Sequence, residues 1–145
     1  MARAFVDTNV LVYAFDRNEP TKRELARTLL RDWDGDLVIS TQVLQEFFVV
    51  TTRKLERPLS EEKAEEACQS LAALPVVASD RGLVLRSIAL ARRFRIALWD
   101  ALIVTAAQDG GCSLVLSEDL QHGRSFDNVS IQNPFPEGDG VNERV

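Results

Sequence analysis

The chain has 145 residues, 46% of them apolar and 27% charged, which is the composition of one ordinary globular domain rather than of a disordered or disulfide-stapled chain. Its 17 basic and 22 acidic side chains give a net charge of −5, which argues against a protein that clamps a polyanion with an extended basic face. No apolar run approaches the roughly 20 residues of a membrane span, and the N-terminus lacks a signal-peptide pattern, so we expect no membrane association and a cytoplasmic location.

The first third of the chain predicts strands that alternate with helices. Ala4 to Val6 form a short apolar run, and Asp7-Thr8-Asn9 are residue types that cap a following helix. Apolar residues from Leu25 to Trp33 then recur at helical spacing. A second apolar run at Leu37–Ile39 predicts the next strand, and Ser40 or Thr41 can cap the helix after it.

The same alternation continues through the rest of the chain. A helix starts at Ser60 and ends near Pro75. The later predicted elements are a strand over Val76–Ala78, a helix that begins at Ser79-Asp80, a helix over 100–108, a strand over Ser113–Leu116 and a fifth strand over Val129–Ile131. Strands that alternate with helices form a parallel sheet covered on both faces, so we expect an α/β fold. We expect one domain over 1–135 and a flexible tail over 136–145, which is rich in Gly, Asp, Glu and Asn.

Four carboxylates occupy positions where a parallel α/β protein binds ligands or where an anion is costly. Asp7 directly follows the first strand and Asp119 follows the fourth, and the carboxyl ends of such strands form the ligand-binding edge. Glu46 interrupts an otherwise apolar helix, and Asp100 opens a nearly uncharged one. A carboxylate removed from water needs a cation or takes up a proton, because the lost hydration is expensive. We therefore interpret these four residues as a shared anionic site.

The chemistry of these side chains favours a hard divalent cation. Oxygen ligands with no nearby His or Cys suit Mg²⁺ or Mn²⁺ better than zinc or copper. Such a site supports the hydrolysis of phosphodiester bonds. Thr8, Asn9 and Ser117 lie beside the carboxylates in the sequence, and we expect their hydrogen bonds to orient the metal ligands.

Each of the four carboxylates also has an ordinary structural interpretation. Asp7 and Asp100 could simply cap helices. Glu46 could reach solvent from the edge of its helix, and Asp119 could be a turn residue. The coincidence of residue type and position is what favours a shared site over these interpretations. The single histidine, His122, has no second histidine near it, so we expect it on the surface rather than on a metal.

A nucleic-acid substrate would need a source of positive charge other than the net charge. Bound divalent cations could supply part of it, because a sum over side chains omits them. Clusters of basic residues could supply the remainder or could be solvated helix faces. They are Arg86, Arg92, Arg93 and Arg95 in one cluster and Arg53, Lys54 and Arg57 in another.

The segments around the four carboxylates resemble the motifs of the PIN-domain nucleases, in the order that the family has them. Together they cover residues 3–135, and four ordered motifs are far more specific than a single Asp-Thr-Asn. The segments are Val6 to Tyr13, the helix from Ser40 to Phe47, Leu98 to Ile103, Leu116 to Leu120, and the closing Asn133-Pro134-Phe135. Ser117 stands where a Thr is common and keeps the hydroxyl. Glu118 lies beside Asp119 and is a second candidate for the fourth acidic position, for which the alignment favours Asp119.

The resemblance implies a three-layer α/β/α sandwich with a five-stranded parallel sheet and an endoribonuclease that depends on Mg²⁺ or Mn²⁺. It also implies that Asp7, Glu46, Asp100 and Asp119 are catalytic and hold the metal. The size is most similar to VapC toxins of type II toxin–antitoxin modules, which are held inactive by a VapB antitoxin and frequently form homodimers. A nuclease of this kind leaves a 5′-phosphate and a 3′-hydroxyl on the cut RNA. A role in RNA maturation is the alternative within the same family.

Two other classes of function share some of these sequence features. A haloacid-dehalogenase-like phosphatase or a response receiver also places an Asp after its first strand. The phosphatase pattern needs a second Asp where this chain has Asn9, and the receiver needs an adjacent acidic pair and a downstream Lys. A nuclease-like module that only binds a partner is disfavoured because all four acidic positions are filled.

Overall fold

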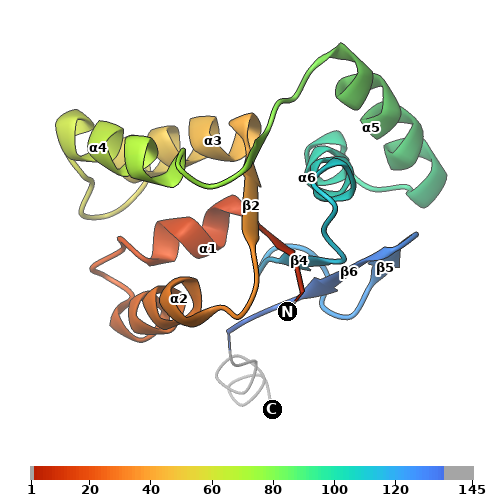
Figure 1. The fold of residues 1–145 in the computed structure, drawn as a ribbon. Helices are drawn as coiled ribbons and strands as arrows, with labels where there is room; N and C mark the ends of the chain where they lie inside the picture. Colours follow the sequence, from red (N-terminus) through yellow and green to blue (C-terminus); the bar gives the residue numbers. More distant parts are fainter. Residues whose placement is uncertain (1, 136–145) are drawn as a thin grey trace.

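The computed structural model describes residues 2–135 as strands alternating with helices (Figure 1). The strands are β1 (Ala4–Val6), β2 (Leu37–Ser40), β3 (Val76–Val77), β4 (Leu114–Leu116), β5 (Ser125–Phe126) and β6 (Val129–Gln132). The helices are α1 (Thr8–Tyr13), α2 (Pro20–Asp32), α3 (Thr41–Arg53), α4 (Glu61–Leu71), α5 (Arg81–Phe94) and α6 (Leu98–Asp109). The tail predicted for 136–145 lies outside the described residues.

One sheet with the strand order β3-β2-β1-β4-β6-β5 organises the fold. The strands β3, β2, β1, β4 and β6 run parallel, which confirms the five parallel strands predicted from the sequence. The sheet has one strand more than expected, because β5 pairs antiparallel with β6 through a tight hairpin. Asp127 lies in this hairpin with a φ of 57°. A strand of two residues shows no hydrophobic alternation, so the sequence pattern could not reveal it.

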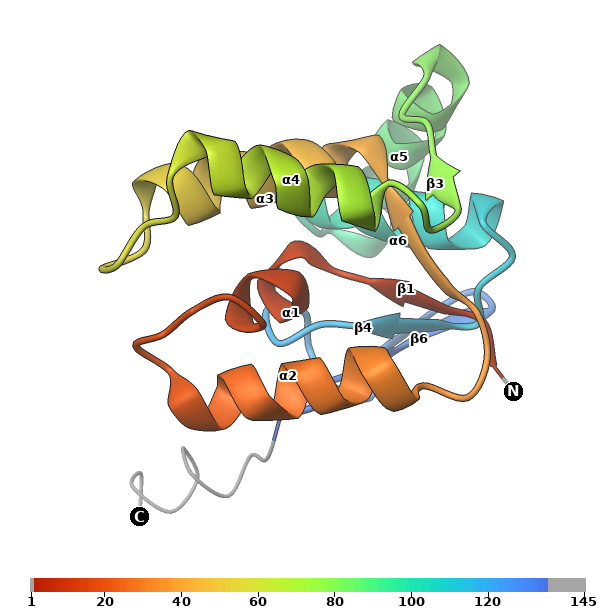
Figure 2. The same cartoon turned by 60° about the vertical axis from the view of Figure 1, so that its left-hand side comes forward.

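Helices cover both faces of the sheet, which confirms the α/β/α arrangement. Figure 2 shows α1 and α2 on one side of the strands and α6 on the other. Helix α6 packs against β1, β2, β4 and β6, and α5 packs on α6. Helices α3 and α4 lie against each other, and α3 also contacts α1. In residues 2–135, no helix has both the length and the apolar character needed to span a membrane.

The core forms where the sheet meets α6. All three residues of β1 are fully buried, and every residue of α6 from Ala101 to Ala107 is buried. A helix that is apolar on all sides must be covered on all sides, so α6 occupies the centre of its layer. Cys112 is buried and Cys68 half-buried, and both are free thiols.

Most helices begin at the residues that the sequence singled out as caps. The carboxylate of Asp7 accepts from the backbone of α1, and Ser40, Ser60 and Asp80 cap α3, α4 and α5 in the same way. Helix α6 is different because it begins at Leu98, two residues earlier than predicted, and has no side-chain cap. The interpretation of Asp100 as a helix cap is therefore wrong.

Candidate active site

The fold brings the four predicted carboxylates to one edge of the sheet. Asp7 follows β1 and Asp119 follows β4, and these two strands are neighbours, so their carboxyl ends coincide. Glu46 comes from the middle of α3, and Asp100 from the first turn of α6. Burial raises the pKa of Asp7 and of Asp100, and the charges of Asp119 and Glu46 raise both further, which places Asp7 and Asp100 each within electrostatic reach of Asp119 and Glu46.

Asp7 is the most deeply placed member of this acidic cluster, with 7% of the residue exposed. Burial raises its pKa from 3.8 to about 6, and the charges of Asp119 and Glu46 add to this rise. Its oxygens accept from the Thr8 backbone N at 2.7 Å and from Ser117 Oγ at 2.7 Å, and both hydrogen bonds oppose the rise. Asp7 is thus a helix cap and a member of the cluster at the same time.

Asp100 and Asp119 have carboxylate oxygens that remain uncommitted. Within residues 2–135, neither carboxylate accepts a hydrogen bond, although Asp119 donates its backbone N–H to Ser117 Oγ at 3.1 Å. Burial raises the pKa of Asp100, followed by the charges of Asp119 and Glu46. Asp119 is exposed at the mouth of the cluster. In the described part of the chain, no three His, Cys, Asp or Glu side chains already enclose a point where an ion would sit.

Glu46 is held by two side chains, one of which the sequence analysis missed. Thr8 Oγ1 donates to Glu46 Oε1 at 2.6 Å, and Gln42 Nε2 donates to Glu46 Oε2 at 3.1 Å. The same Gln42 amide lies 3.5 Å from the carbonyl oxygen of Trp99, next to Asp100, and so links α3 to the start of α6. Gln42 precedes Glu46 by four residues on α3, a spacing that places two side chains on one helix face and could have identified it.

The loop after β4 is fixed by the predicted hydrogen-bonding residues. The fully buried Ser117 donates to Asp7 and accepts from the backbone N–H groups of Asp119 and Leu120 at 3.1 and 3.2 Å. Asn9 Nδ2 donates to Asp7 at 3.2 Å, and Asn9 Oδ1 accepts from the Glu118 backbone N at 3.0 Å. Thr8, Asn9 and Ser117 therefore lie where they can orient the acidic cluster.

The two neighbouring carboxylates of this loop have different surroundings. Glu118 accepts from Lys22 Nζ and from Tyr13 Oη, each at 2.6 Å. Lys22 also lies 4.9 Å from the centre of the Tyr13 ring. Asp119, by contrast, acts electrostatically on Asp7 and Asp100. Lys22 and Tyr13 were not singled out from the sequence, because Lys22 lies 96 positions from Glu118 along the chain.

Replacing Lys22 with methionine is expected to destabilise the protein by about 1 to 2 kcal/mol, because the half-buried Glu118 would lose its cation. Urea unfolding of both proteins measures this difference. Arg31→Met is the matched control, since the pair of Arg31 with Asp32 is exposed and should contribute nothing measurable. Equal losses of stability in the two variants would contradict a structural role for the contact between Lys22 and Glu118.

A groove of about 640 Å³ opens beside the acidic cluster. Its lining combines polar groups of the cluster with an apolar wall from α1 and α3. The lining residues are Thr8, Asn9, Val12, Tyr13, Asp16, Gln45, Glu46, Val49, Val50, Lys54, Leu55 and Asp119. We call it the site groove. A substrate in this groove would contact both carboxylates and aliphatic side chains.

The remaining sequence candidates lie away from the cluster or are partly neutralised. His122 is exposed, and its Nδ1 accepts from the backbone N of Asn133 at 3.0 Å. Two residues of the first basic cluster pair with acids, Arg86 with Asp109 and Arg93 with Asp127. Lys54, from the second basic cluster, lines the site groove.

Comparisons with known proteins identify the family and the fold. The family model described as PIN domain matches residues 4–129. A toxin–antitoxin complex from Klebsiella pneumoniae has a chain that superimposes with a TM-score of 0.69 at 20% identity, covering 91% of this chain and 98% of that one. A sarcin–ricin-loop-cleaving toxin, VapC20 of Mycobacterium tuberculosis, gives a TM-score of 0.65 at 16% identity, with 80% and 89% covered.

A third similar structure is that of DNA-bound VapBC from Salmonella typhimurium. Its TM-score is 0.63 at 17% identity, and the match covers 93% of this chain and all of that one (100%). At these identities the likeness concerns the fold. A comparison with curated protein sequences gives no match.

Proposed function

Since the chain belongs to the PIN-domain family, we propose that it is a metal-dependent endoribonuclease that hydrolyses phosphodiester bonds in RNA. The observation that carries the proposal is that four carboxylates from separate parts of the chain converge, with Asp7 and Asp119 after neighbouring strands and the charges of Asp119 and Glu46 acting on both Asp7 and Asp100. We assign catalytic and metal-holding roles to Asp7, Glu46, Asp100 and Asp119. Thr8, Asn9 and Ser117 position them through the hydrogen bonds described above.

The acidic cluster fits a hard divalent cation such as Mg²⁺ or Mn²⁺. All its donors are carboxylate oxygens, and those of Asp100 and Asp119 are uncommitted within residues 2–135. The repulsion and burial that raise the pKa of Asp7 and Asp100 are relieved when a positive ion is present. When bound, such an ion supplies Lewis-acid polarisation of the phosphate and makes a water molecule more acidic.

The protein's own residues contribute orientation. Ser117 and the Thr8 backbone hold the carboxylate of Asp7 in place, because each donates to one of its two oxygens. Thr8 Oγ1 and Gln42 do the same for Glu46. Lys22 holds Glu118 in an ion pair. Asp119 is therefore the carboxylate of that loop that is available to the metal and the substrate. Hydrolysis at this site would leave a 5′-phosphate and a 3′-hydroxyl.

We further propose that the chain is the toxin of a VapBC-type module, with 1–135 as its nuclease domain, a VapB-like antitoxin as partner and a homodimer as its assembly. The named neighbours that are toxin–antitoxin complexes support the partner. Leu85 and Ile88 on α5 are 60% and 42% exposed and lie three residues apart, which supports an apolar contact with a second subunit.

The direct test is cleavage of a fluorescently labelled RNA with Mg²⁺, with Mn²⁺ and with EDTA. We expect cleavage with either ion, none with EDTA, and recovery when excess Mn²⁺ is added back. The ends of the products are identified by ligation, which requires a 5′-phosphate and a 3′-hydroxyl. Undiminished cleavage in EDTA would refute the metal-dependent mechanism, and products with a 3′-phosphate would refute the assigned bond cleavage.

A further inference from the structure

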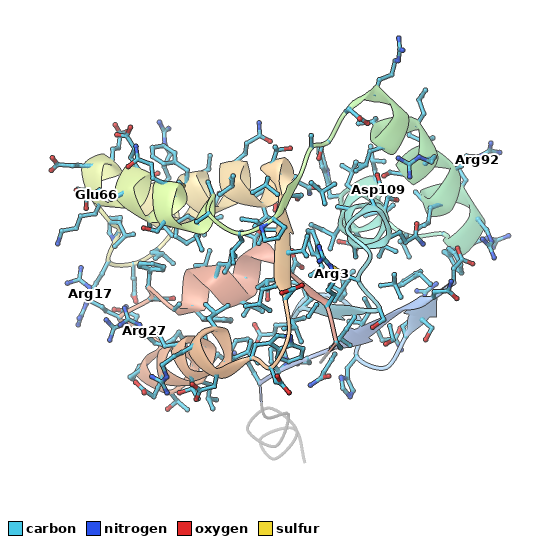
Figure 3. All side chains as sticks on the ribbon, in the orientation of Figure 1. Arg3, Arg17, Arg27, Glu66, Arg92 and Asp109 are labelled. Carbon is cyan, nitrogen blue, oxygen red and sulfur yellow. The ribbon has the colours of Figure 1, made fainter. Side chains whose placement is uncertain are left out.

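A second groove, of about 590 Å³, lies between α2 and α4 and is lined by four basic residues. They are Arg17, Arg23, Arg27 and Lys63, and we call this the basic groove. Glu66 is the acidic residue among the lining side chains. Figure 3 shows Arg17 and Arg27 near each other below α4, on the side of the molecule opposite to Arg92.

The basic groove carries more positive than negative side chains. In residues 2–135, none of its four basic side chains forms an ion pair, whereas Arg3, Arg31, Arg86 and Arg93 each do. The Nε atom of Arg23 is buried and has no hydrogen-bond partner among the described residues. A buried donor without a partner is unfavourable, so an acceptor that reaches it from the groove gains by satisfying it.

The basic groove and the site groove share the same two loops. Tyr13 and Asp16 line the site groove, and the adjacent Phe15 and Arg17 line the basic groove. On the other side, Leu55 lines the first and Pro58 the second. A side-chain contact between Asn18 and Glu56 joins the two loops. A polymer that leaves the site groove across these loops therefore arrives at the basic groove.

We propose that the basic groove binds phosphodiester groups of the RNA, several nucleotides away from the bond that is cut. The inference rests on the proposed endoribonuclease function and extends it. Arg forks and a Lys are the side chains that bind phosphate oxygens most strongly. Four basic side chains beside one acidic residue, Glu66, also supply the local attraction that a protein of net charge −5 needs to hold a polyanion. A polymer is favoured over a free phosphate because the two grooves adjoin.

The double variant Arg17→Gln/Lys63→Gln tests the proposal, since both side chains are exposed and neither touches the acidic cluster. The matched control is Arg81→Gln/Arg92→Gln, which removes the same charge from exposed positions on α5. For an oligouridine RNA of about 20 nucleotides, we expect the double variant to raise KM about tenfold with kcat unchanged. For one of about 4 nucleotides, which cannot reach both grooves, we expect no change.

Binding measured by fluorescence anisotropy in EDTA separates this inference from the proposed function. The salt dependence of binding to the long RNA should weaken, with the slope of log K against log salt falling by about 1.4 for two lost phosphate contacts. The control variant should keep the native slope. If the native protein binds long RNA through the basic groove but cuts none, the inference stands and the nuclease assignment fails.

Two outcomes would overturn the inference while leaving the nuclease assignment intact. In the first, the double variant cuts and binds both RNAs as the control variant does. The groove would then be a binding site for an acidic protein segment instead. In the second, inorganic phosphate and the short RNA lose affinity as strongly as the long RNA, which would make the groove a site for small anions only. The double variant's unfolding midpoint in urea should match the native one.

Discussion

Replacing Asp7 with asparagine is expected to lower the rate of RNA cleavage by more than about a hundredfold, because the loss of even the hydrogen-bonding partners of metal ligands typically costs 10- to 100-fold. Asparagine keeps the size of the side chain and an oxygen that can accept from the Thr8 backbone N. It removes the charge that Asp119 and Glu46 act on. The expected result is a folded protein with a greatly reduced kcat.

Asp32→Asn is the control for this measurement, since Asp32 is an exposed carboxylate at the end of α2 that pairs with Arg31. It should cleave RNA at the native rate. Single-turnover cleavage with saturating Mn²⁺ measures the chemical step in all three proteins. An Asp7→Asn variant that cuts within a few-fold of the native rate would remove Asp7 from the catalytic set, and with it the central member of the acidic cluster.

The second large effect concerns stability. Without a divalent ion, ionised Asp7 is expected to destabilise the fold by up to about 3 kcal/mol. Folding raises its pKa from 3.8 to about 6, and a pKa difference of one corresponds to about 1.4 kcal/mol. The sign follows from proton binding. Between about pH 4 and about pH 6, the folded protein holds a proton on Asp7 that the unfolded chain has released, so the free energy of unfolding falls as pH rises through this interval.

Urea unfolding in EDTA across this pH interval measures the effect. Burial and the charges of Asp119 and Glu46 also raise the pKa of Asp100, so part of the decline belongs to other groups. The difference between Asp7→Asn and the native protein isolates Asp7. We expect the two proteins to have similar stability near pH 4, and the variant to be more stable near pH 7. If the free energies of unfolding of the two proteins change in parallel with pH, ionised Asp7 does not destabilise the fold.

The sequence predicted the parallel α/β architecture because its signals are local. Apolar runs such as Ala4–Val6 and capping residues such as Ser40, Ser60 and Asp80 act within a few positions, and each began the predicted element. The start of α6 was misplaced because Ala97 offers no capping side chain. The strand β5 was missed because two residues carry no periodicity.

The sequence also identified the carboxylates. The positions of those that follow strands predicted that they share one edge of the sheet. The sequence did not identify the groups that hold them. Lys22 became visible only in three dimensions, because its hydrogen bond to Glu118 joins residues 96 positions apart. Gln42 lies four residues from Glu46 on the same helix, a spacing that could have identified it but that hydrophobic periodicity does not single out. Hydrophobic spacing carries no information about such pairs, because a lysine free on the surface and a lysine paired with a distant carboxylate have the same local sequence pattern.

By itself, then, the sequence determined which segments become strands and helices and which acidic residues end or interrupt them, because these properties depend on neighbours a few residues away. The tertiary structure decided what those residues do to one another. It set the burial of Asp7, the ion pair of Glu118 with Lys22, and the gathering of four basic side chains between α2 and α4. Charges interact through space with a strength that depends on separation and burial, and both are fixed only when distant segments pack together.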